Sequence, residues 1–291
     1  MPKVIVLVGP SQSWLEQLHS DVLVNCVVTS PSYWSQRDHG HQDQDGMEPT
    51  PKKYVANQLQ VFGLVKAHLV REGNVWIVID DTYSSGRGKP VGPDYKQSAR
   101  RFGVRPADRA PSVTGVPKKS LSLVPELLAA GLVYDLGYVM RARISWEKPN
   151  AVPEPTAFDR VQRTTETIWH LVQQIRHYFF DKAPLIERGL DSTVWTIATK
   201  PFGKHRAVFP GELVEPMILS SCPEGGWVLD HNAGSGTVGV SAYQHGRNAL
   251  LIELNPAYVD GVLLPRLYAA GIPASDITVW HLGEDTRGLA L

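Results

Sequence analysis

Two stretches of the sequence carry residues whose types and spacing could do chemistry. The first is Ser30-Pro31-Ser32-Tyr33-Trp34, which follows a run of apolar residues and places a hydroxyl, a constrained carbonyl and two aromatic rings together. An exocyclic amine of cytosine or adenine is a poor nucleophile, because its lone pair is delocalised into the ring. Acceptors at its two protons, such as Ser30 and the Pro31 carbonyl, would turn the lone pair toward an electrophilic methyl. Tyr33 could stack on a base that has left the duplex. Taken alone, this stretch fits a turn with buried aromatics better.

The second stretch runs from Val228 to Thr237 and reads as a strand, an acidic residue and a glycine-rich turn that enters a helix. Glycine allows the backbone to approach a ligand closely, and the amides at the helix start point outward. About twenty residues on, an apolar run ends in Glu253, which could accept hydrogen bonds from ribose hydroxyls. The pattern favours an adenosine-type ligand, although its spacing separates neither nucleotides from S-adenosylmethionine nor a site from a tight structural turn. A phosphate-binding loop is disfavoured because Lys and Ser or Thr do not follow Gly236.

Alternating strands and helices must position these residues. Such alternation predicts an α/β fold, a Rossmann-like and mostly parallel sheet flanked by helices, whose ligands lie at the carboxyl ends of the strands. Strand patterns cover Val4–Val8, Val22–Thr29, Val75–Ile79, Tyr138–Trp146, Thr165–Val172, Trp227–Leu229, Leu250–Glu253 and Ile277–Leu282. Helical spacing covers Ser11–His19, Tyr54–Arg71, Ser120–Ala130 and Glu212–Cys222.

Together these stretches resemble the amino-methyltransferase family that modifies DNA. Residues 30–34 resemble its catalytic SPPY/W motif, residues 230–237 its cofactor motif, and the order of the two is that of the β-type members. Three further segments, at 80–83, 146–154 and 209–216, are similar to family motifs. The resemblance covers most of the chain and implies an S-adenosylmethionine-dependent methyltransferase fold. It implies catalytic roles for Ser30, Pro31, Ser32 and Tyr33. It implies cofactor binding by Asp230, Ala233, Gly234, Ser235, Gly236, Thr237, Glu253, Phe209, Pro210 and Glu212.

The chain departs from the family pattern at four positions. Ser32 replaces the second proline of the catalytic motif, and His231 and Asn232 replace a proline and a packing aromatic beside the cofactor. Pro10 stands where an aspartate would contact the adenine. Ser11, or an acid after the strand at residues 277–282, is a candidate substitute.

A basic segment indicates contact with DNA. The whole chain has a formal net charge of zero, but residues 87–119 hold nine basic and two acidic residues, a net charge of +7. Basic loops suit phosphate contacts, and a loop without a ligand is the alternative. The predicted DNA-binding residues are Arg100, Arg101, Arg105, Arg109, Lys118 and Lys119.

The rest of the sequence predicts one catalytic domain over residues 1–291. Recognition loops are expected at about 35–53, 84–119 and 173–204. The sequence shows no apolar run long enough for a membrane span and no metal-ligand spacing, so we expect neither a membrane nor a metal partner. The two cysteines, Cys26 and Cys222, fit reduced core residues in a cytoplasmic protein of prokaryotic or phage origin, and a homodimer is possible.

The predicted function is methyl transfer from S-adenosylmethionine to the N4 of a flipped cytosine in double-stranded DNA. Cytosine is favoured because the serine-type motif is usual for N4-cytosine enzymes of the family. Two alternatives stay open at this point. One is adenine N6 as the acceptor, and the other is a catalytically silent protein that binds DNA or cofactor.

Overall fold

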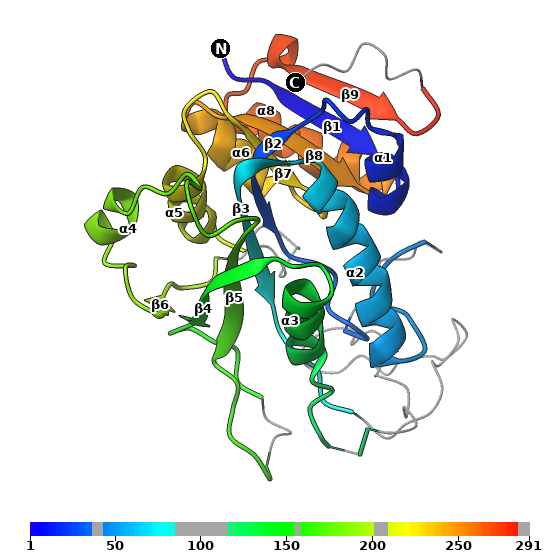
Figure 1. Ribbon diagram of the computed structural model, residues 1–291, viewed down its shortest axis with the longest axis vertical. Coiled ribbons are helices and arrows are strands. Elements are labelled where there is room, and N and C mark those ends of the chain that lie inside the picture. The colour runs from blue at the N-terminus through cyan, green and yellow to red at the C-terminus, as the bar shows by residue number, and fades with distance from the viewer. Residues whose placement is uncertain (37–42, 85–115, 118, 155–157, 201–208, 285–291) are drawn as a thin grey trace. The chain divides into compact units, whose positions relative to one another are not determined.

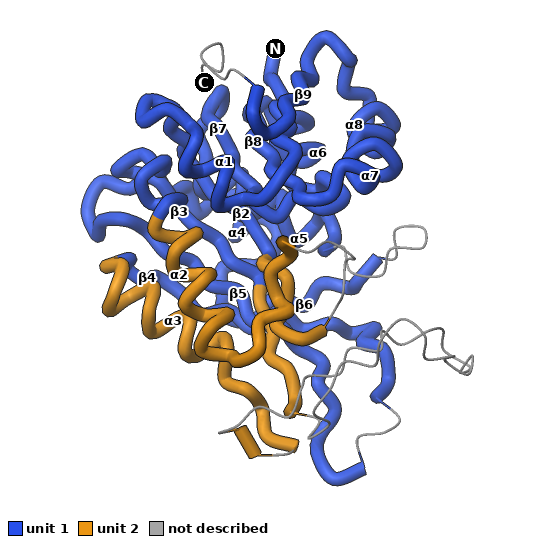
Figure 2. Tube along the Cα trace, turned by 90° about the vertical axis from the view of Figure 1, so that its right-hand side faces the viewer, with its two compact units in different colours: residues 1–30, 64–78, 138–291 blue, residues 31–63, 79–137 orange. Residues whose placement is uncertain are grey.

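The structure is a computed structural model that describes residues 1–36, 43–84, 116–117, 119–154, 158–200 and 209–284. The chain divides into two compact units (Figure 2). The first comprises Met1–Ser30, Leu64–Val78 and Tyr138–Leu291, and the second comprises Pro31–Gly63 and Ile79–Gly137. The prediction of one domain over 1–291 stays a prediction, and each unit is described by itself below.

The first unit is built on a sheet with the strand order β6-β4-β5-β3-β2-β7-β8-β1-β9 (Figure 1). The strands are β1 (Val4–Val8), β2 (Val24–Thr29), β3 (Leu69–Ile79), β4 (Val139–Glu147), β5 (Thr165–Val172), β6 (Val194–Thr196), β7 (Trp227–Asp230), β8 (Asn248–Glu253) and β9 (Ile277–His281). The α-helices are α1 (Ser11–Gln17), α2 (Pro51–Ala67), α3 (Val124–Tyr134), α4 (Ala183–Glu187), α5 (Gly211–Ser221), α6 (Thr237–Gln244), α7 (Pro256–Tyr258) and α8 (Leu264–Ala269). A π-helical turn, η1 (Val259–Leu263), precedes α8, and a 3-10 turn, η2 (Ala274–Asp276), precedes β9.

Most of the sheet is parallel, which confirms the predicted fold class. β1 pairs in parallel with β8 and β9, β2 with β3 and β7, and β7 with β8. Strands that are covered on both faces read as continuous apolar runs, and β1 is buried along its whole length. The ends of β1, β2, β7 and β8 therefore lie along one edge of the sheet, called the carboxyl edge below.

The β4–β5 hairpin extends the sheet with reversed directions. β4 and β5 are antiparallel, and β4 is parallel to β6. Gln173, just past the end of β5, donates a hydrogen bond of 2.6 Å to the carbonyl of Leu69 at the start of β3. Further along, His170 stacks on Trp76 with 4.2 Å between ring centroids. β5 thus runs antiparallel to β3, so the turn between β4 and β5 belongs to the carboxyl edge.

The core of the first unit lies between this sheet and the helices that cover it. α5 and α6 supply fully buried apolar side chains that belong to one cluster with those of β1, β2 and β8. Representative members are Val6, Val28, Met217, Val238 and Leu251. None of the helices in the described residues combines the length and the apolar character that a membrane span requires.

Two predicted helices have different bounds in the structure. The pattern over Tyr54–Arg71 predicts one helix, but α2 ends at Ala67 and residues 69–71 open β3. The ring of His68 marks the change, since its nitrogens lie 2.9 Å and 2.8 Å from the carbonyl oxygens of Val22 and Leu15. The apolar spacing continues across this point, and for that reason the sequence pattern did not reveal the end.

The second correction concerns α3 in the second unit. The predicted range was Ser120–Ala130, with Gly131 after its end, whereas α3 covers Val124–Tyr134. Pro125 sits in the first turn, where a missing N–H costs nothing. Gly131 lies inside the helix because Leu59 of α2 packs against it, and a Cβ there would stand 2.5 Å from Leu59 Cδ1. The glycine provides space for this contact and does not terminate the helix.

Candidate active site

The carboxyl ends of β2 and β7 form a switch point in the sheet. From β2 the chain leaves through α2 to β3 on one side, and from β7 it leaves through α6 to β8 on the other (Figure 1). In open α/β sheets, the crevice outside such a switch point is where ligands bind. The two stretches singled out in the sequence begin at these two strand ends, Ser30 after β2 and His231 after β7.

A hydrogen bond joins the two strand ends directly. Thr29 Oγ1 donates to Asp230 Oδ1 over 2.9 Å, and the amide of Asn232 donates to the same oxygen over 3.0 Å. Asp230 Oδ2 has no hydrogen-bond partner among the residues that the structure describes. Burial raises the pKa of the Asp230 carboxyl to about 7, against the lowering effect of these two hydrogen bonds. The site thus contains a buried carboxylate oxygen that a cationic group of a ligand would satisfy.

The glycine turn is held open by its own backbone geometry. Gly234 and Gly236 have φ values of 51° and 79°, in the left-handed region that favours glycine. At Gly236 a side chain would also approach Leu263, whose Cγ lies 3.3 Å from the position of a Cβ. Thr237 then begins α6, and its buried Oγ1 has no hydrogen-bond partner in the described part of the chain.

Glu253 ties this turn to the end of β8. One of its oxygens accepts a hydrogen bond of 2.8 Å from the Gly234 amide, and the other accepts one of 3.1 Å from the Asn255 amide. Burial raises the pKa of the Glu253 carboxyl, opposed by these backbone amides. Each carboxylate oxygen has two lone pairs, so further acceptor capacity remains for the hydroxyls of a ligand. Ala233 completes the turn, donating to the Ile252 carbonyl over 2.9 Å.

The remaining turn residues are held by neighbouring elements. Ser235 is buried, and its hydroxyl accepts a hydrogen bond from the Arg266 guanidinium of α8. His231 is also buried, and desolvation lowers the pKa of its imidazole to about 3, so the ring is neutral at physiological pH. The sequence analysis expected a packing aromatic to be missing at residues 231–232. The structure puts a neutral imidazole in the core at the first of these positions.

The end of β1 adjoins this turn. Ser11 donates its hydroxyl hydrogen to the His231 carbonyl, so the candidate substitute for the missing aspartate already links α1 to the glycine turn. The predicted strand near the C-terminus is confirmed as β9, which pairs with β1 so that Val8 lies opposite His281. Glu284 follows it, and its carboxylate accepts a 2.8 Å hydrogen bond from the His281 amide. Adenine contact by Ser11 or by the end of β9 stays a prediction.

The segment at 209–212 leads into α5. Phe209 is half-buried against the core, and the buried Pro210 directly precedes the helix. Glu212 forms an ion pair with Lys200, whose hydrogen bond lowers the pKa of the Glu212 carboxyl. Both residues of this pair are about half exposed or more, so the pair is weak and a ligand could compete for it.

The second unit holds the rest of the catalytic motif, with Pro31 buried and Ser32 and Tyr33 half-buried. The hydroxyl of Tyr54 in α2 donates a 2.8 Å hydrogen bond to the Ser32 carbonyl, and Trp34 Nε1 donates one of 2.9 Å to the Glu48 carbonyl. Sequence reasoning missed Tyr54. The signal was present, because a tyrosine on the apolar side of a helix needs a partner for its hydroxyl.

Asp81 has a structural task within the second unit. Its carboxylate accepts 2.8 Å hydrogen bonds from the amides of Thr82 and Leu123, and a third from the Ser122 hydroxyl. It therefore joins the segment after β3 to the start of α3. This agrees with the interpretation that one aspartate of the pair at 80–81 orients the loop, rather than working as a general acid or base.

The predicted DNA contacts lie almost entirely beyond the described residues. Arg100, Arg101, Arg105, Arg109 and Lys118 fall in those segments. Lys119 is described and exposed, with a φ of 67°, and its amide donates a 2.8 Å hydrogen bond to the Ser84 carbonyl. The DNA-binding set stays a prediction. Within the described residues, no cluster of three or more His, Cys, Asp or Glu side chains could hold a metal ion.

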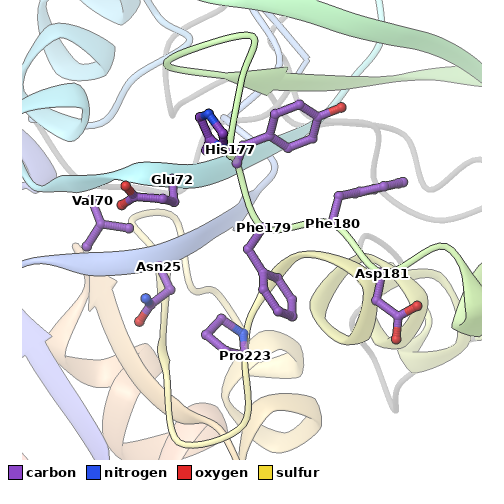
Figure 3. A pocket seen from close by; sticks show the side chains of 9 residues that line it. Asn25, Val70, Glu72, His177, Phe179, Phe180, Asp181 and Pro223 are labelled. Carbon is purple, nitrogen blue, oxygen red and sulfur yellow. The ribbon is translucent and has the colours of Figure 1, made fainter.

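A cavity of about 630 Å³ lies elsewhere in the first unit (Figure 3). Its walls include Asn25 near the start of β2, Glu72 near the start of β3, and the aromatic rings of Phe179 and Phe180. These strand positions belong to the edge of the sheet opposite the carboxyl edge. The cavity is therefore separate from the switch point, and none of the predicted site residues lines it.

Comparison with known proteins identifies the fold and the family. A family model described as DNA methylase matches residues 24–263. The chain is 40% identical over 258 residues to the Type II methyltransferase M.Cfr9I of Citrobacter freundii, covering 87% of this chain and 84% of that protein. It is 36% identical over 264 residues to the Type II methyltransferase M.SmaI of Serratia marcescens, covering 88% of each.

Solved structures agree on the fold. The PvuII DNA methyltransferase (cytosine-N4-specific) matches with a TM-score of 0.66 at 19% identity, over 89% of this chain and 84% of that one. The complex of M1.HpyAVI with S-adenosylmethionine matches with a TM-score of 0.58 at 16% identity, over 90% and 98%. The open sheet, the glycine turn and the acidic strand end define an S-adenosylmethionine-dependent methyltransferase fold. The chain belongs to the DNA methylase family, whose methyl donor is S-adenosylmethionine.

Proposed function

We propose that this protein transfers a methyl group from S-adenosylmethionine to the N4 of a cytosine that has been flipped out of duplex DNA. The observation that carries the proposal is the contact between Thr29 and Asp230. Ser30 follows Thr29 directly in the chain, so the catalytic motif starts where the cofactor motif starts, at neighbouring strand ends. Donor and acceptor sites need this proximity, since methyl transfer occurs between atoms about 3 Å apart.

The cofactor would be held by the residues of the first unit. The carboxylate of Glu253 has acceptor capacity for the two ribose hydroxyls, and Asp230 Oδ2 offers a negative charge to the ammonium group. The glycine turn lets the backbone approach the ligand, with the first amides of α6 directed outward. When bound, S-adenosylmethionine supplies an electrophilic methyl group on a sulfonium. Phe209, Pro210 and Glu212 would flank its methionine end.

The target base would be held by the catalytic motif. The Ser30 hydroxyl and the Pro31 carbonyl accept hydrogen bonds from the amine, which gives its nitrogen a lone pair directed at the methyl group. Tyr33 stacks on the base. Ser32 contributes through its carbonyl, which Tyr54 holds at 2.8 Å, so the hydrogen bond compensates for the proline that the family pattern has at this position.

Cytosine N4 is favoured over adenine N6 by two observations. The motif begins with serine, as in the N4-cytosine enzymes that the chain resembles, and the PvuII enzyme with a similar fold is cytosine-N4-specific. The family includes enzymes of both specificities, and adenine N6 is the second candidate. The Type II methyltransferases among the relatives further support a role beside a restriction enzyme, in a bacterial cytoplasm. A homodimer stays a possibility for the same protein.

The test is nucleoside analysis of DNA from cells that express the protein. N4-methylcytosine is the expected product, and N6-methyladenine would replace the proposal by the second candidate. In vitro, labelled methyl transfer to that DNA should be lost in Ser30→Ala. It should persist in Ser192→Ala, which removes an exposed hydroxyl just before β6, at the opposite edge of the sheet. Cofactor binding by calorimetry without any transfer would overturn catalysis and leave a silent binding protein.

A further inference from the structure

The turn between β4 and β5 presents exposed apolar side chains at the carboxyl edge. Phe158 is 92% exposed, Val161 84% and Val152 77%. Apart from Met1 and Tyr134, no large apolar residue in the described part of the chain is as exposed as these. Exposed apolar residues that cluster on one element indicate a contact surface. Figure 1 shows this turn extending beyond the two strands it joins.

The turn is cross-linked, so its apolar side chains are presented by an ordered scaffold. The Glu154 carboxylate accepts a hydrogen bond of 2.6 Å from the Arg160 guanidinium, and Arg163 lies 3.8 Å from its other oxygen. At the base of the turn, the Lys148 amide donates a 2.9 Å hydrogen bond to the Thr164 carbonyl. Asn150 anchors the same arm by accepting a 2.9 Å hydrogen bond from the Thr199 amide.

These ion pairs also decide the kind of contact. Both guanidinium groups are engaged by one carboxylate, so the turn is a poor ligand for the DNA phosphates. What it offers is apolar, and the apolar part of a duplex is its base stack. Proteins that distort DNA insert phenylalanine, leucine, isoleucine or methionine side chains between base steps in this way.

The position of the turn agrees with that role. In the sheet, β5 and β4 are the second and third strands from β2, so the turn begins about 10–15 Å from the strand that carries Ser30. A duplex is wider than this, since its major groove alone measures about 12 Å. DNA that delivers a base to Ser30 therefore extends over a distance of the same size as that to the turn.

We propose that Phe158, supported by Val161, is a wedge that enters the base stack of the DNA and fills the gap left by the flipped base. This inference rests on the proposed function. The flipped state loses stacking and pairing, and an inserted ring replaces part of the lost contact. Phe158 is thus a positioning residue that shifts the flipping equilibrium without touching the reacting atoms.

The test uses a duplex that contains the site methylated in expressing cells, with 2-aminopurine at the target position and S-adenosylhomocysteine as the non-reactive cofactor. Flipping raises the fluorescence of 2-aminopurine. Phe158→Ala should reduce this rise about tenfold at saturating protein, and Phe158→Leu should reduce it less. The matched control is Ile175→Ala, which removes a 61% exposed apolar side chain beyond the other end of β5. It should behave as wild type.

A second substrate separates the wedge from a folding defect. When the target base stands opposite an abasic site, flipping costs less and the wedge is needed less, so Phe158→Ala should recover most of the fluorescence rise. An equal rise in Phe158→Ala and Ile175→Ala on the intact duplex would overturn the wedge. A change in self-association or in DNA affinity alone, with the flipped fraction unaltered, would also overturn it. Loss of methyl transfer in the wild-type protein itself would instead refute the proposed function.

Discussion

Thr29 and Asp230 are 201 residues apart in the chain, yet the Thr29 hydroxyl lies 2.9 Å from Asp230 Oδ1. Both residues are fully or almost fully buried, and β2 and β7 pair in parallel just before them. The hydrogen bond therefore fixes the distance between the starts of the catalytic and cofactor motifs. It also supplies one of the two donors that stabilise a buried carboxylate.

Thr29→Val should destabilise the protein and weaken cofactor binding. The change keeps the shape of the side chain but removes the donor, which leaves Asp230 with one hydrogen bond fewer in a buried position. The expected loss in the free energy of unfolding is about 1–3 kcal/mol. Urea unfolding measures the loss, and Thr29→Ser, which keeps the hydroxyl, is the control. Equal stability of the valine and serine variants would show that the hydrogen bond is unimportant.

Asp230 should make stability depend on pH. Its folded-state pKa of about 7 lies above the ordinary value of 3.8, so the folded protein keeps a proton that the unfolded chain releases. The stabilising contribution is complete below pH 3.8 and is lost as the pH rises through about 7. Asp230→Asn cannot titrate, and its unfolding free energy in cofactor-free protein should vary less between pH 5 and 8 by a few kcal/mol. Parallel pH profiles for variant and wild type would contradict this.

The fold was predictable where one element carries its own signal. The apolar run over Val4–Val8 is β1 to the residue, since a strand buried on both faces has an uninterrupted apolar sequence. The glycine turn was predictable because residues with left-handed backbone conformations need glycine. Gly131 shows the limit, because its meaning depends on Leu59, a residue in another helix. Local sequence could not distinguish a glycine that ends a helix from one that makes room for a neighbour.

The candidate site was predictable in its residue types and less so in its partners. Ser11 was expected to face the ligand, but its hydroxyl binds the His231 carbonyl, a contact that depends on the order of β1, β8 and β7 in the sheet. The pairing of Thr29 with Asp230 likewise depends on strand order, which no local pattern reveals. The acceptor role of Glu253 toward the Gly234 amide adds a structural task to its predicted ribose contact.

Glu253→Ala should weaken the binding of S-adenosylmethionine by about 10- to 100-fold. The carboxylate is expected to bind the ribose and also accepts the Gly234 amide, and hydrogen bonds to a charged group contribute about 1.5–3 kcal/mol. Isothermal calorimetry gives the affinity. Glu224→Ala is the matched control, because this exposed glutamate stands near the start of β7, at the opposite edge of the sheet. Unchanged affinity in Glu253→Ala would refute the ribose assignment.

Tyr54→Phe should lower kcat while leaving cofactor affinity unchanged. The hydroxyl of this fully buried side chain holds the Ser32 carbonyl, and its loss lets the catalytic motif move without touching the glycine turn. Burial keeps the pKa of the phenol well above its ordinary value, so it acts as a neutral donor. The free energy of unfolding should fall by about 1 kcal/mol. Steady-state kinetics with DNA, beside calorimetry with the cofactor, separate the two effects. A lower cofactor affinity with normal kcat would contradict this positioning role.

The basic segment at 87–119 should determine how DNA affinity depends on salt. Each phosphate contact releases counterions, so the slope of log K against log salt changes by about 0.9 for each contact removed. Replacing Arg100, Arg101, Arg105 and Arg109 by glutamine should therefore flatten the slope by about 2–4. Fluorescence anisotropy of a labelled duplex between 50 and 200 mM salt, on the order used for such slopes, measures this. Arg188→Gln, in which the guanidinium removed is paired with Glu215 in the first unit, is the control and should leave the slope unchanged. If the fourfold variant keeps the wild-type slope, the segment does not contact phosphates, and the DNA-binding surface must be sought among the other basic residues of the chain.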